Sequence, residues 1–216
     1  MTILVVGASG NIGCQLVKQL DAKGQKVRAL VRDTKKAPQG KNVEAVAGDL
    51  TKPETLDQAF KGVDGVFVVV AASPDMTKLE KNAFDAAKKN GVKHVVLLSV
   101  AGANTQSPIN LGKWHAESEQ NLAKSGLGYT VLQPTMFMQN TMNNLPTIKG
   151  EGKVYFATKN GHLPVIDVVD IAATAAAILT SPSSHNGKRY YLTGPEALTQ
   201  AEMWTRISKV AGDNFE

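Results

Sequence analysis

Short apolar runs recur along the chain and are separated by stretches with helical spacing. Residues 3–6 form the first run, residues 26–31 alternate polar and apolar side chains, and residues 65–70 are almost wholly apolar. Unbroken apolar runs of this length are typical of central parallel strands that are buried on both faces. The pattern predicts β-strands at residues 3–6, 26–31, 43–47, 65–70, 94–98, 129–132 and 190–192.

Amphipathic segments fill the intervals between these strands. Apolar residues three and four positions apart indicate helices whose apolar face packs on a sheet. Capping boxes at residues 51–54 and 199–202 predict two helix starts, and Asp167 is expected to cap an alanine-rich helix. The helices are placed at residues 12–20, 76–86, 110–124 and 171–179, with further helices beginning near 51–54 and 199–202.

A glycine triplet directly follows the first strand. The sequence from Gly7 to Gly13 has the spacing G-x-x-G-x-x-G and leads into the first predicted helix. Its glycines permit a sharp turn, close approach of a phosphate to Gly10, and close packing of the helix on the sheet. The N–H groups at the helix start, with Ser9 and Asn11, would then face phosphate oxygens. This order predicts a dinucleotide site, with a plain turn that binds nothing as the alternative.

The alternation of strands and helices predicts the fold class. It indicates an α/β fold, a Rossmann-like doubly wound parallel sheet with right-handed crossovers. We interpret residues 1–134 as an NAD(P)-binding Rossmann-like domain. Amides, prolines and glycines interrupt the pattern between residues 137 and 161. We therefore interpret residues 135–216 as a small C-terminal substrate lobe, interleaved with elements that return to the sheet.

Composition narrows the possible functions. The chain has 216 residues, of which 43% are hydrophobic and 20% are charged, as in an ordinary globular protein. It has no apolar run near the ~20 residues of a membrane span and no signal peptide, so a cytoplasmic location without membrane contact is expected. The single cysteine, Cys14, argues against disulfides and a metal site. The net charge of +5 is scattered and only 6% of residues are aromatic, so direct nucleic-acid binding is not expected.

Ligands of such sheets lie at the carboxyl ends of the strands. Arg32 ends the second strand with Lys36 nearby, and cations there pair with a 2′-phosphate. This favours NADP(H) over NAD(H), although Asp33 leaves a carboxylate facing the ribose as an alternative. Asp49 and Leu50 follow the third strand and are expected to contact the adenine, unless Asp49 merely begins a helix.

The next strand ends carry small residues. Ala71 and Ala72 would let a ribose pass close to the backbone, or they simply pack tightly. Ser99 ends the fifth strand, where its hydroxyl would contact the cofactor or bind neighbouring backbone. Pro134, Thr135 and Phe137 follow the sixth strand and are expected to lie against the nicotinamide. An acceptor pocket is expected at residues 137–140, that is Phe137, Met138, Gln139 and Asn140.

Taken together, these motifs resemble the atypical short-chain dehydrogenase/reductases, and most of all their NmrA-like, NAD(P)-binding branch. The resemblance covers nearly the whole chain and implies the same fold and a dinucleotide cofactor. The branch contains NADPH-dependent quinone reductases and also non-catalytic dinucleotide-binding regulators of transcription. The matching segments are residues 7–13, 30–33, 48–50, 114–119, 125–130, 132–137 and 167–172.

The sequence departs from that family at two places. Most short-chain dehydrogenases use a Tyr-x-x-x-Lys pair, but alignment on Glu119 puts His115 at the lysine position and Leu111 at the tyrosine position. The resemblance implies that His115 contacts the ribose or the substrate, with a packed histidine of no chemical role as the alternative. Relatives continue well past the last predicted helix, so part of the substrate lobe is expected to be absent after Glu216.

The favoured function is an NAD(P)H-dependent oxidoreductase that reduces quinone- or enone-like small molecules by hydride transfer without a Tyr–Lys pair. A non-catalytic NADP(H)-binding redox sensor of the NmrA type is the alternative. A sugar-nucleotide epimerase is disfavoured because its chemistry needs the tyrosine, and a homodimer is left open. His115 is the candidate catalytic residue. The predicted cofactor-binding residues are Gly7, Ser9, Gly10, Asn11, Ile12, Arg32, Lys36, Asp49, Leu50, Ala71, Ala72, Ser99, His115, Pro134, Thr135 and Phe137.

Overall fold

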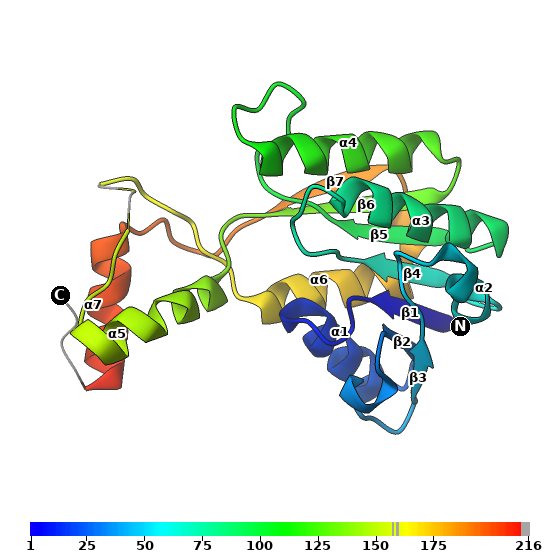
Figure 1. Cartoon of the computed structure of the whole chain (residues 1–216), viewed down its shortest axis with the longest axis horizontal. Helices are drawn as coiled ribbons and strands as arrows, with labels where there is room; N and C mark the ends of the chain where they lie inside the picture. Colours follow the sequence, from blue (N-terminus) through cyan, green and yellow to red (C-terminus); the bar gives the residue numbers. More distant parts are fainter. Residues whose placement is uncertain (157, 159, 213–216) are drawn as a thin grey trace.

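A parallel sheet forms the centre of the molecule in the computed structural model, which describes residues 1–156, 158 and 160–212 (Figure 1). Within these residues the sheet has seven strands in the order β3-β2-β1-β4-β5-β6-β7, and every neighbouring pair is parallel. This confirms the predicted Rossmann-like α/β fold. The strands are β1 (Thr2–Val6), β2 (Lys26–Val31), β3 (Val43–Ala47), β4 (Gly65–Val68), β5 (His94–Leu98), β6 (Gly128–Pro134) and β7 (Lys188–Leu192).

Helices cover both faces of the sheet. One face packs against α1 and α6, and the other packs against α2, α3 and α4 (Figure 1). The helices are α1 (Asn11–Ala22), α2 (Leu56–Phe60), α3 (Met76–Lys89), α4 (Asn110–Lys124), α5 (Leu145–Glu151), α6 (Val168–Thr180) and α7 (Gln200–Ala211). Short 3-10 turns are η1 (Thr34–Lys36), η2 (Pro53–Thr55), η3 (Met138–Asn144) and η4 (Pro182–His185).

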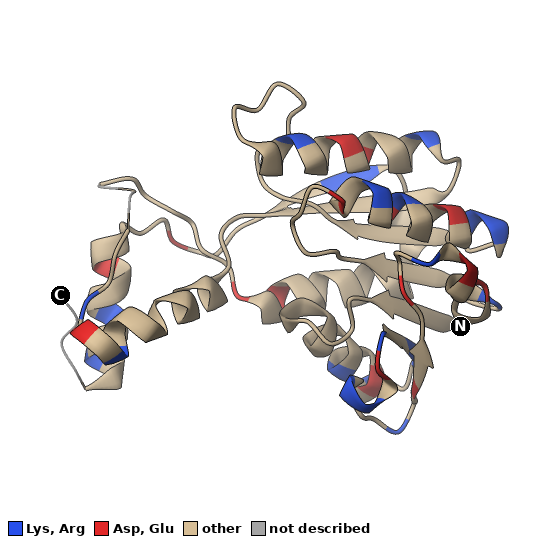
Figure 2. Cartoon of the chain, in the orientation of Figure 1, with Lys and Arg blue, Asp and Glu red and all other residues tan. Residues whose placement is uncertain are grey.

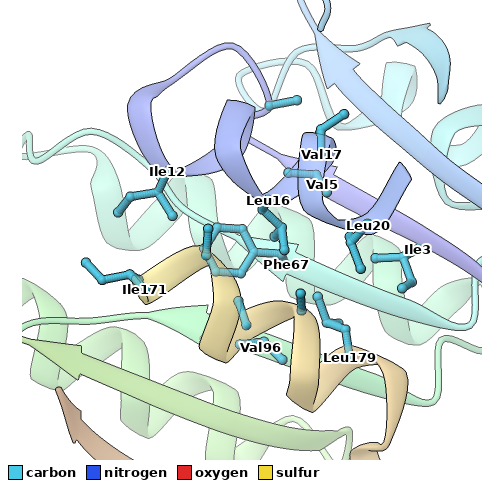
Figure 3. Packing of buried hydrophobic residues seen from close by; sticks show 14 of the residues in the cluster. Ile3, Val5, Ile12, Leu16, Val17, Leu20, Phe67, Val96, Ile171 and Leu179 are labelled. Atoms are coloured by element: carbon cyan, nitrogen blue, oxygen red, sulfur yellow. The ribbon is translucent and has the colours of Figure 1, made fainter. Parts of the chain in front are cut away.

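The apolar face of α1 fixes the glycine turn against the sheet. Leu16, Val17 and Leu20 are fully buried, as their spacing predicted. Phe67 of β4 lies between α1 and α6, so both helices share one core on this face (Figure 3). Burial of each such side chain contributes roughly 1.5–3 kcal/mol. The start of α1 is therefore held firmly at the carboxyl end of β1.

Two of the three predicted helix caps are present. Thr199 and Glu202 form a reciprocal capping box at the start of α7, and the Asp167 carboxylate accepts the N–H of Val169. The box predicted at residues 51–54 was wrong. Thr51 donates both its N–H and its hydroxyl to the Asp49 carboxylate, and Lys52, not Thr51, is the N-cap of the turn that follows. The chain forms the 3-10 turn η2 there, and α2 begins at Leu56.

A small lobe projects from the carboxyl edge of the sheet and contains α5 and α7 (Figure 1). Its core consists of the buried residues Val165, Met203 and Trp204, against which Ile148 of α5 packs. The sequence did not predict α5. Both α6 and β7 follow residue 134 in the chain but pack with the main sheet. The predicted division into residues 1–134 and 135–216 stays a prediction.

Charged residues are dispersed over the helices. Figure 2 shows lysines and arginines interspersed with aspartates and glutamates on α3, α4 and α7. Among the described residues, none of the helices combines the length and the apolar character needed to cross a lipid bilayer.

Candidate functional site

The glycine turn between β1 and α1 has the shape of a phosphate cradle. Gly7 adopts a φ of +78°, which side chains rarely tolerate, and its carbonyl accepts the N–H of Gly10 at 3.0 Å. A Cβ at Gly13 would lie 2.2 Å from the carbonyl oxygen of Gly7, so only glycine permits this packing. No side chain caps α1, whose N-cap is Gly10. The first N–H groups of the helix are thus suited to an anion such as pyrophosphate.

A cavity of 740 Å³ runs from this turn along the carboxyl ends of the strands. Among its described lining residues there is no lysine, arginine, aspartate or glutamate, and one of them is the histidine His115. Such a cavity suits an uncharged, largely apolar ligand portion. It is lined by Gly10, Asn11, Ile12, Gly13, Val69, Val70, Ala71, Ala72, Leu98, Ser99, Val100, Ala101, Leu111, His115, Thr135, Met136, Phe137, Asn140, Leu163, Pro164 and Tyr191.

A second cavity, of 330 Å³, lies on the other side of the glycine turn. It extends over the ends of β2 and β3, so the two cavities together follow the carboxyl edge of the sheet on both sides of β1. Its lining residues are Val6, Gly7, Ser9, Leu30, Val31, Arg32, Gly48, Asp49, Leu50, Thr51, Val69, Val70, Ala71, Ser73 and Leu79.

Arg32 and Asp49 line the second cavity, whereas Asp33 follows Arg32 in the chain and is not among the described lining residues. Asp33 turns its carboxylate to the N–H of Lys35 at 3.0 Å, where it caps η1. Asp49 accepts from the N–H and the hydroxyl of Thr51, and these bonds hold the pKa of its carboxyl below its usual value, with Arg32 contributing electrostatically. Arg32 lines the cavity and is therefore the cation placed to meet an anionic group there.

His115 of α4 lies at the boundary between the cavity and the protein interior. Its exposed fraction is 8%, and its Nδ1 is buried without a hydrogen-bond partner among the described residues. Burial lowers the pKa of the ring, and the carboxylate of Glu119 one turn later acts in the opposite direction. Desolvation therefore favours the neutral imidazole, which can donate a hydrogen bond through one nitrogen only.

A buried carboxylate links the strands beside His115. Glu119 accepts hydrogen bonds from the hydroxyl of Ser99 and, at 2.8 Å, from the side-chain amide of Gln133. Its second oxygen pairs with Arg189 of β7 at 3.0 Å. The Ser99 hydroxyl thus donates to Glu119 and not to backbone, while its predicted contact with the cofactor stays a prediction. Sequence reasoning did not foresee this cluster, because its members come from four separate elements.

A sequence model of the family described as NAD(P)H-binding matches residues 7–182, which is most of the chain. The chain belongs to this NAD(P)H-binding family. The predicted resemblance to the atypical short-chain dehydrogenase/reductases is confirmed.

Relatives of this NAD(P)H-binding protein include characterised oxidoreductases. It is 41% identical to the NAD(P)H azoreductase of Xenophilus azovorans over 212 residues, which covers 97% of this chain and 74% of the relative. Triphenylmethane reductase from Citrobacter sp., solved with NADP(H), is 26% identical with a TM-score of 0.87 over 99% of this chain and 77% of that chain. The NADPH-dependent quinone oxidoreductase of Escherichia coli with NADPH is 27% identical with a TM-score of 0.87, over 99% and 76% respectively.

Most residues predicted to bind NAD(P)H lie in the two cavities of the structure. The larger cavity includes Gly10, Asn11, Ile12, Ala71, Ala72, Ser99, His115, Thr135 and Phe137. The second cavity includes Gly7, Ser9, Arg32, Asp49, Leu50 and Ala71. Lys36 is exposed on η1 and Pro134 is buried within β6, and neither lines these two cavities. Their contact with the cofactor stays a prediction.

The predicted acceptor residues separate into two groups. Phe137 and Asn140 line the larger cavity, whereas Gln139 donates to Asp167 and accepts the N–H of Val168. Gln139 therefore fixes the start of α6. Met138 does not line the two cavities described above. The sequence analysis missed several lining residues, namely Val69, Val70, Val100, Ala101, Leu163, Pro164 and Tyr191. The first four directly follow β4 and β5, so their strand-end position was a usable signal.

Proposed function

We propose that the protein is an NADPH-dependent reductase of quinone-like small molecules. The observation that carries this proposal is a single cavity that joins the phosphate-binding turn at Gly10 to an uncharged end containing His115. A cavity of this size suits part of a cofactor together with a small ligand. The azoreductase and quinone oxidoreductase relatives support the same class of acceptor.

The cofactor residues follow from the two cavities. We infer that the N–H groups at Gly10, Asn11 and Ile12 bind the pyrophosphate, since they begin an uncapped helix at the cradle. Arg32 supports NADPH over NADH, because it lines the second cavity, where the adenosine would lie, whereas the carboxylate of Asp33 accepts the backbone N–H of Lys35. When bound, NADPH supplies the hydride, and the protein supplies its orientation.

His115 would polarise the acceptor. Its Nδ1 is buried without a partner, and a buried N–H without an acceptor is costly, so we assign the proton to Nε2. A neutral ring of this tautomer donates one hydrogen bond to a quinone oxygen that gains negative charge. The apolar walls around Leu111 and Phe137 keep water away from the reacting atoms. The reduced acceptor takes its proton from water once it leaves the cavity, so a tyrosine acid is not required.

The decisive experiment measures NADPH oxidation with a panel of quinones, enones and azo dyes. We expect turnover with at least one planar acceptor, and NADPH binding in titration calorimetry. Clear NADPH binding without turnover of any acceptor would contradict the proposal.

That contrary outcome would favour a redox sensor. The specific observation in its favour is that Leu111, at the position of the usual catalytic tyrosine, lines the cavity. An apolar side chain there donates no proton. A sensor would bind NADPH and NADP⁺ with different affinities and would change its binding to another protein accordingly.

A further inference from the structure

Tyr191 is an exposed aromatic residue in the wall of the larger cavity. It lies in β7, the edge strand, opposite Gln133 of β6. Its neighbours Tyr190 and Leu192 pack against the core on the α1–α6 face. Because side chains alternate along a strand, Tyr191 is on the opposite face, together with Arg189. Its exposed fraction is 60% although it lines the cavity, so its ring is available to a ligand.

The sheet order places Tyr191 far from the phosphate-binding turn. The turn follows β1, and β7 is separated from β1 by β4, β5 and β6. Neighbouring strands lie roughly 4.8 Å apart, so the two ends of the cavity are about 19 Å apart across the sheet. A nicotinamide attached to a pyrophosphate at Gly10 occupies the nearer part of this distance. Tyr191 therefore stands at the end that is left for the acceptor.

The surroundings of Tyr191 indicate which acceptors fit. Met136, Phe137 and Leu163 contribute apolar walls to the same cavity, and its described lining residues include no charged side chain of Lys, Arg, Asp or Glu. Flat aromatic rings gain from stacking on a tyrosine ring beyond the burial of their area. We propose that Tyr191 is a specificity-determining residue, whose ring stacks on flat, aromatic acceptors and holds them at the nicotinamide. This inference rests on the reductase function proposed above.

The ring of Tyr191 carries this role, and its hydroxyl does not. A tyrosine that acts as an acid needs a nearby cation to stabilise the phenolate. The cation on the same face of β7 is Arg189, which pairs with Glu119 at 3.0 Å, and none of the described cavity-lining residues is a lysine or arginine. The hydroxyl is thus not placed to replace the missing tyrosine of the family.

Three variants separate these roles. Tyr191→Phe keeps the ring, Tyr191→Leu removes it but keeps an apolar side chain, and Tyr155→Leu is a matched control. Tyr155 is 61% exposed, belongs to the lobe, and lines neither of the two cavities. We expect Tyr191→Leu to raise the KM for menadione about ten-fold with little change in kcat. Tyr191→Phe and Tyr155→Leu are expected to stay within about two-fold of the wild type.

A binding measurement distinguishes failure of this inference from failure of the proposed function. Menadione is titrated into the NADP⁺-loaded protein, in which no hydride is available, and the Kd of NADP⁺ is measured alongside. We expect Tyr191→Leu to weaken menadione binding about ten-fold and to leave NADP⁺ binding unchanged. Equal menadione affinity and KM in wild type and Tyr191→Leu would overturn the inference, as would a large loss of kcat in Tyr191→Phe. Ring-dependent menadione binding without NADPH oxidation would uphold it while refuting the reductase.

Discussion

The hydroxyl of Ser99, at the end of β5, donates to the buried carboxylate of Glu119 on α4. This bond ties the strand end to the helix that carries His115, one turn before Glu119. Gln133 and Arg189 bind the same carboxylate from β6 and β7. One side chain thus joins three neighbouring strands to α4 beside the larger cavity. The position of His115 therefore depends on a contact that involves neither cofactor nor acceptor.

Replacement of Glu119 is expected to destabilise the fold. Glu119→Ala leaves Ser99 and Gln133 without their acceptor in a buried site, at a cost of about 2–3 kcal/mol of unfolding free energy. Glu119→Gln retains an acceptor oxygen and should cost about 1 kcal/mol. Urea unfolding measures both, with the exposed Glu117→Ala as the control, which should stay within about 0.5 kcal/mol. Equal effects at residues 117 and 119 would contradict the role of the cluster.

Removal of the His115 donor is expected to slow acceptor reduction. His115→Phe keeps a ring but cannot donate, so kcat/KM for a quinone should fall about ten-fold while the Kd of NADPH is kept. Burial lowers the pKa of His115 from 6.5, so the ring stays neutral above that pH. The ratio of wild-type to variant rates should thus be constant from pH 6.5 to about pH 8. A ratio that rises steadily on acidification would show that the charged ring is the donor.

Cofactor preference is expected to depend on Arg32. Arg32→Ala removes the arginine that lines the second cavity and should weaken NADPH binding about ten-fold, with NADH binding unchanged. Lys36→Ala is the comparison, because Lys36 lies on η1 outside that cavity lining. Titration calorimetry with both cofactors measures the change. Equal loss for NADPH and NADH in Arg32→Ala would refute recognition of the 2′-phosphate.

The sequence predicted every strand of the described sheet. The buried central strands β1, β4 and β5 leave continuous apolar runs, and β2 alternates polar and apolar side chains. It also predicted the glycine turn and many lining residues of the larger cavity, since many of them directly follow strands. The capping box at residues 51–54 failed for a local reason. Thr51 donates to the Asp49 carboxylate in a local turn, and spacing alone cannot rank this turn against a cap that accepts a helix N–H.

Other features depend on contacts between distant segments. Pro146 and Gly150 interrupt the periodicity of α5, which is held by Ile148 packing on a core that includes Trp204. The sequence alone does not show which face of the sheet Tyr191 occupies, and the pairing of β7 with β6 determines it. The partners of Glu119 are similarly scattered. Local propensity carries no information about such pairings, which tertiary structure alone determines.

Stability is expected to fall with rising pH because of Glu80 on α3. This carboxyl is fully buried, and both of its oxygens lack a hydrogen bond among the described residues, as does the Ser118 hydroxyl on α4. Burial raises the pKa of Glu80 from 4.5 to about 8, and the Ser118 side chain on α4 acts in the opposite direction. The folded state thus favours protonated Glu80. Its contribution to the free energy of unfolding is complete below pH 4.5 and is lost as the pH rises to about 8.

Glu80→Gln removes this titration. The variant should match the wild type near pH 4.5 and exceed its unfolding free energy by on the order of 4 kcal/mol at about pH 8. Chemical denaturation across this pH range measures the difference, with the exposed Glu117→Gln as the control. A stability difference that does not change with pH would rule out titration of Glu80.

The close contact between Gly13 and the glycine turn predicts a strong effect of a single methyl group. In Gly13→Ala the new Cβ would lie 2.2 Å from the Gly7 carbonyl oxygen and 2.9 Å from the Cα of Ala8, so the start of α1 must move away from β1. We expect a loss of about 2–3 kcal/mol in unfolding free energy. NADPH affinity should fall as well, because the same movement displaces the N–H groups of the cradle.

Gly150→Ala is the matched control for this substitution. Gly150 lies within α5, and a Cβ there meets no atom within 4 Å outside the backbone of its own helix. Alanine is the better helix former, so this variant should gain up to about 0.5–1 kcal/mol and keep its NADPH affinity. Urea unfolding and titration calorimetry on both variants test the contrast. A Gly13→Ala protein with wild-type stability and wild-type NADPH affinity would show that α1 need not contact the turn so closely.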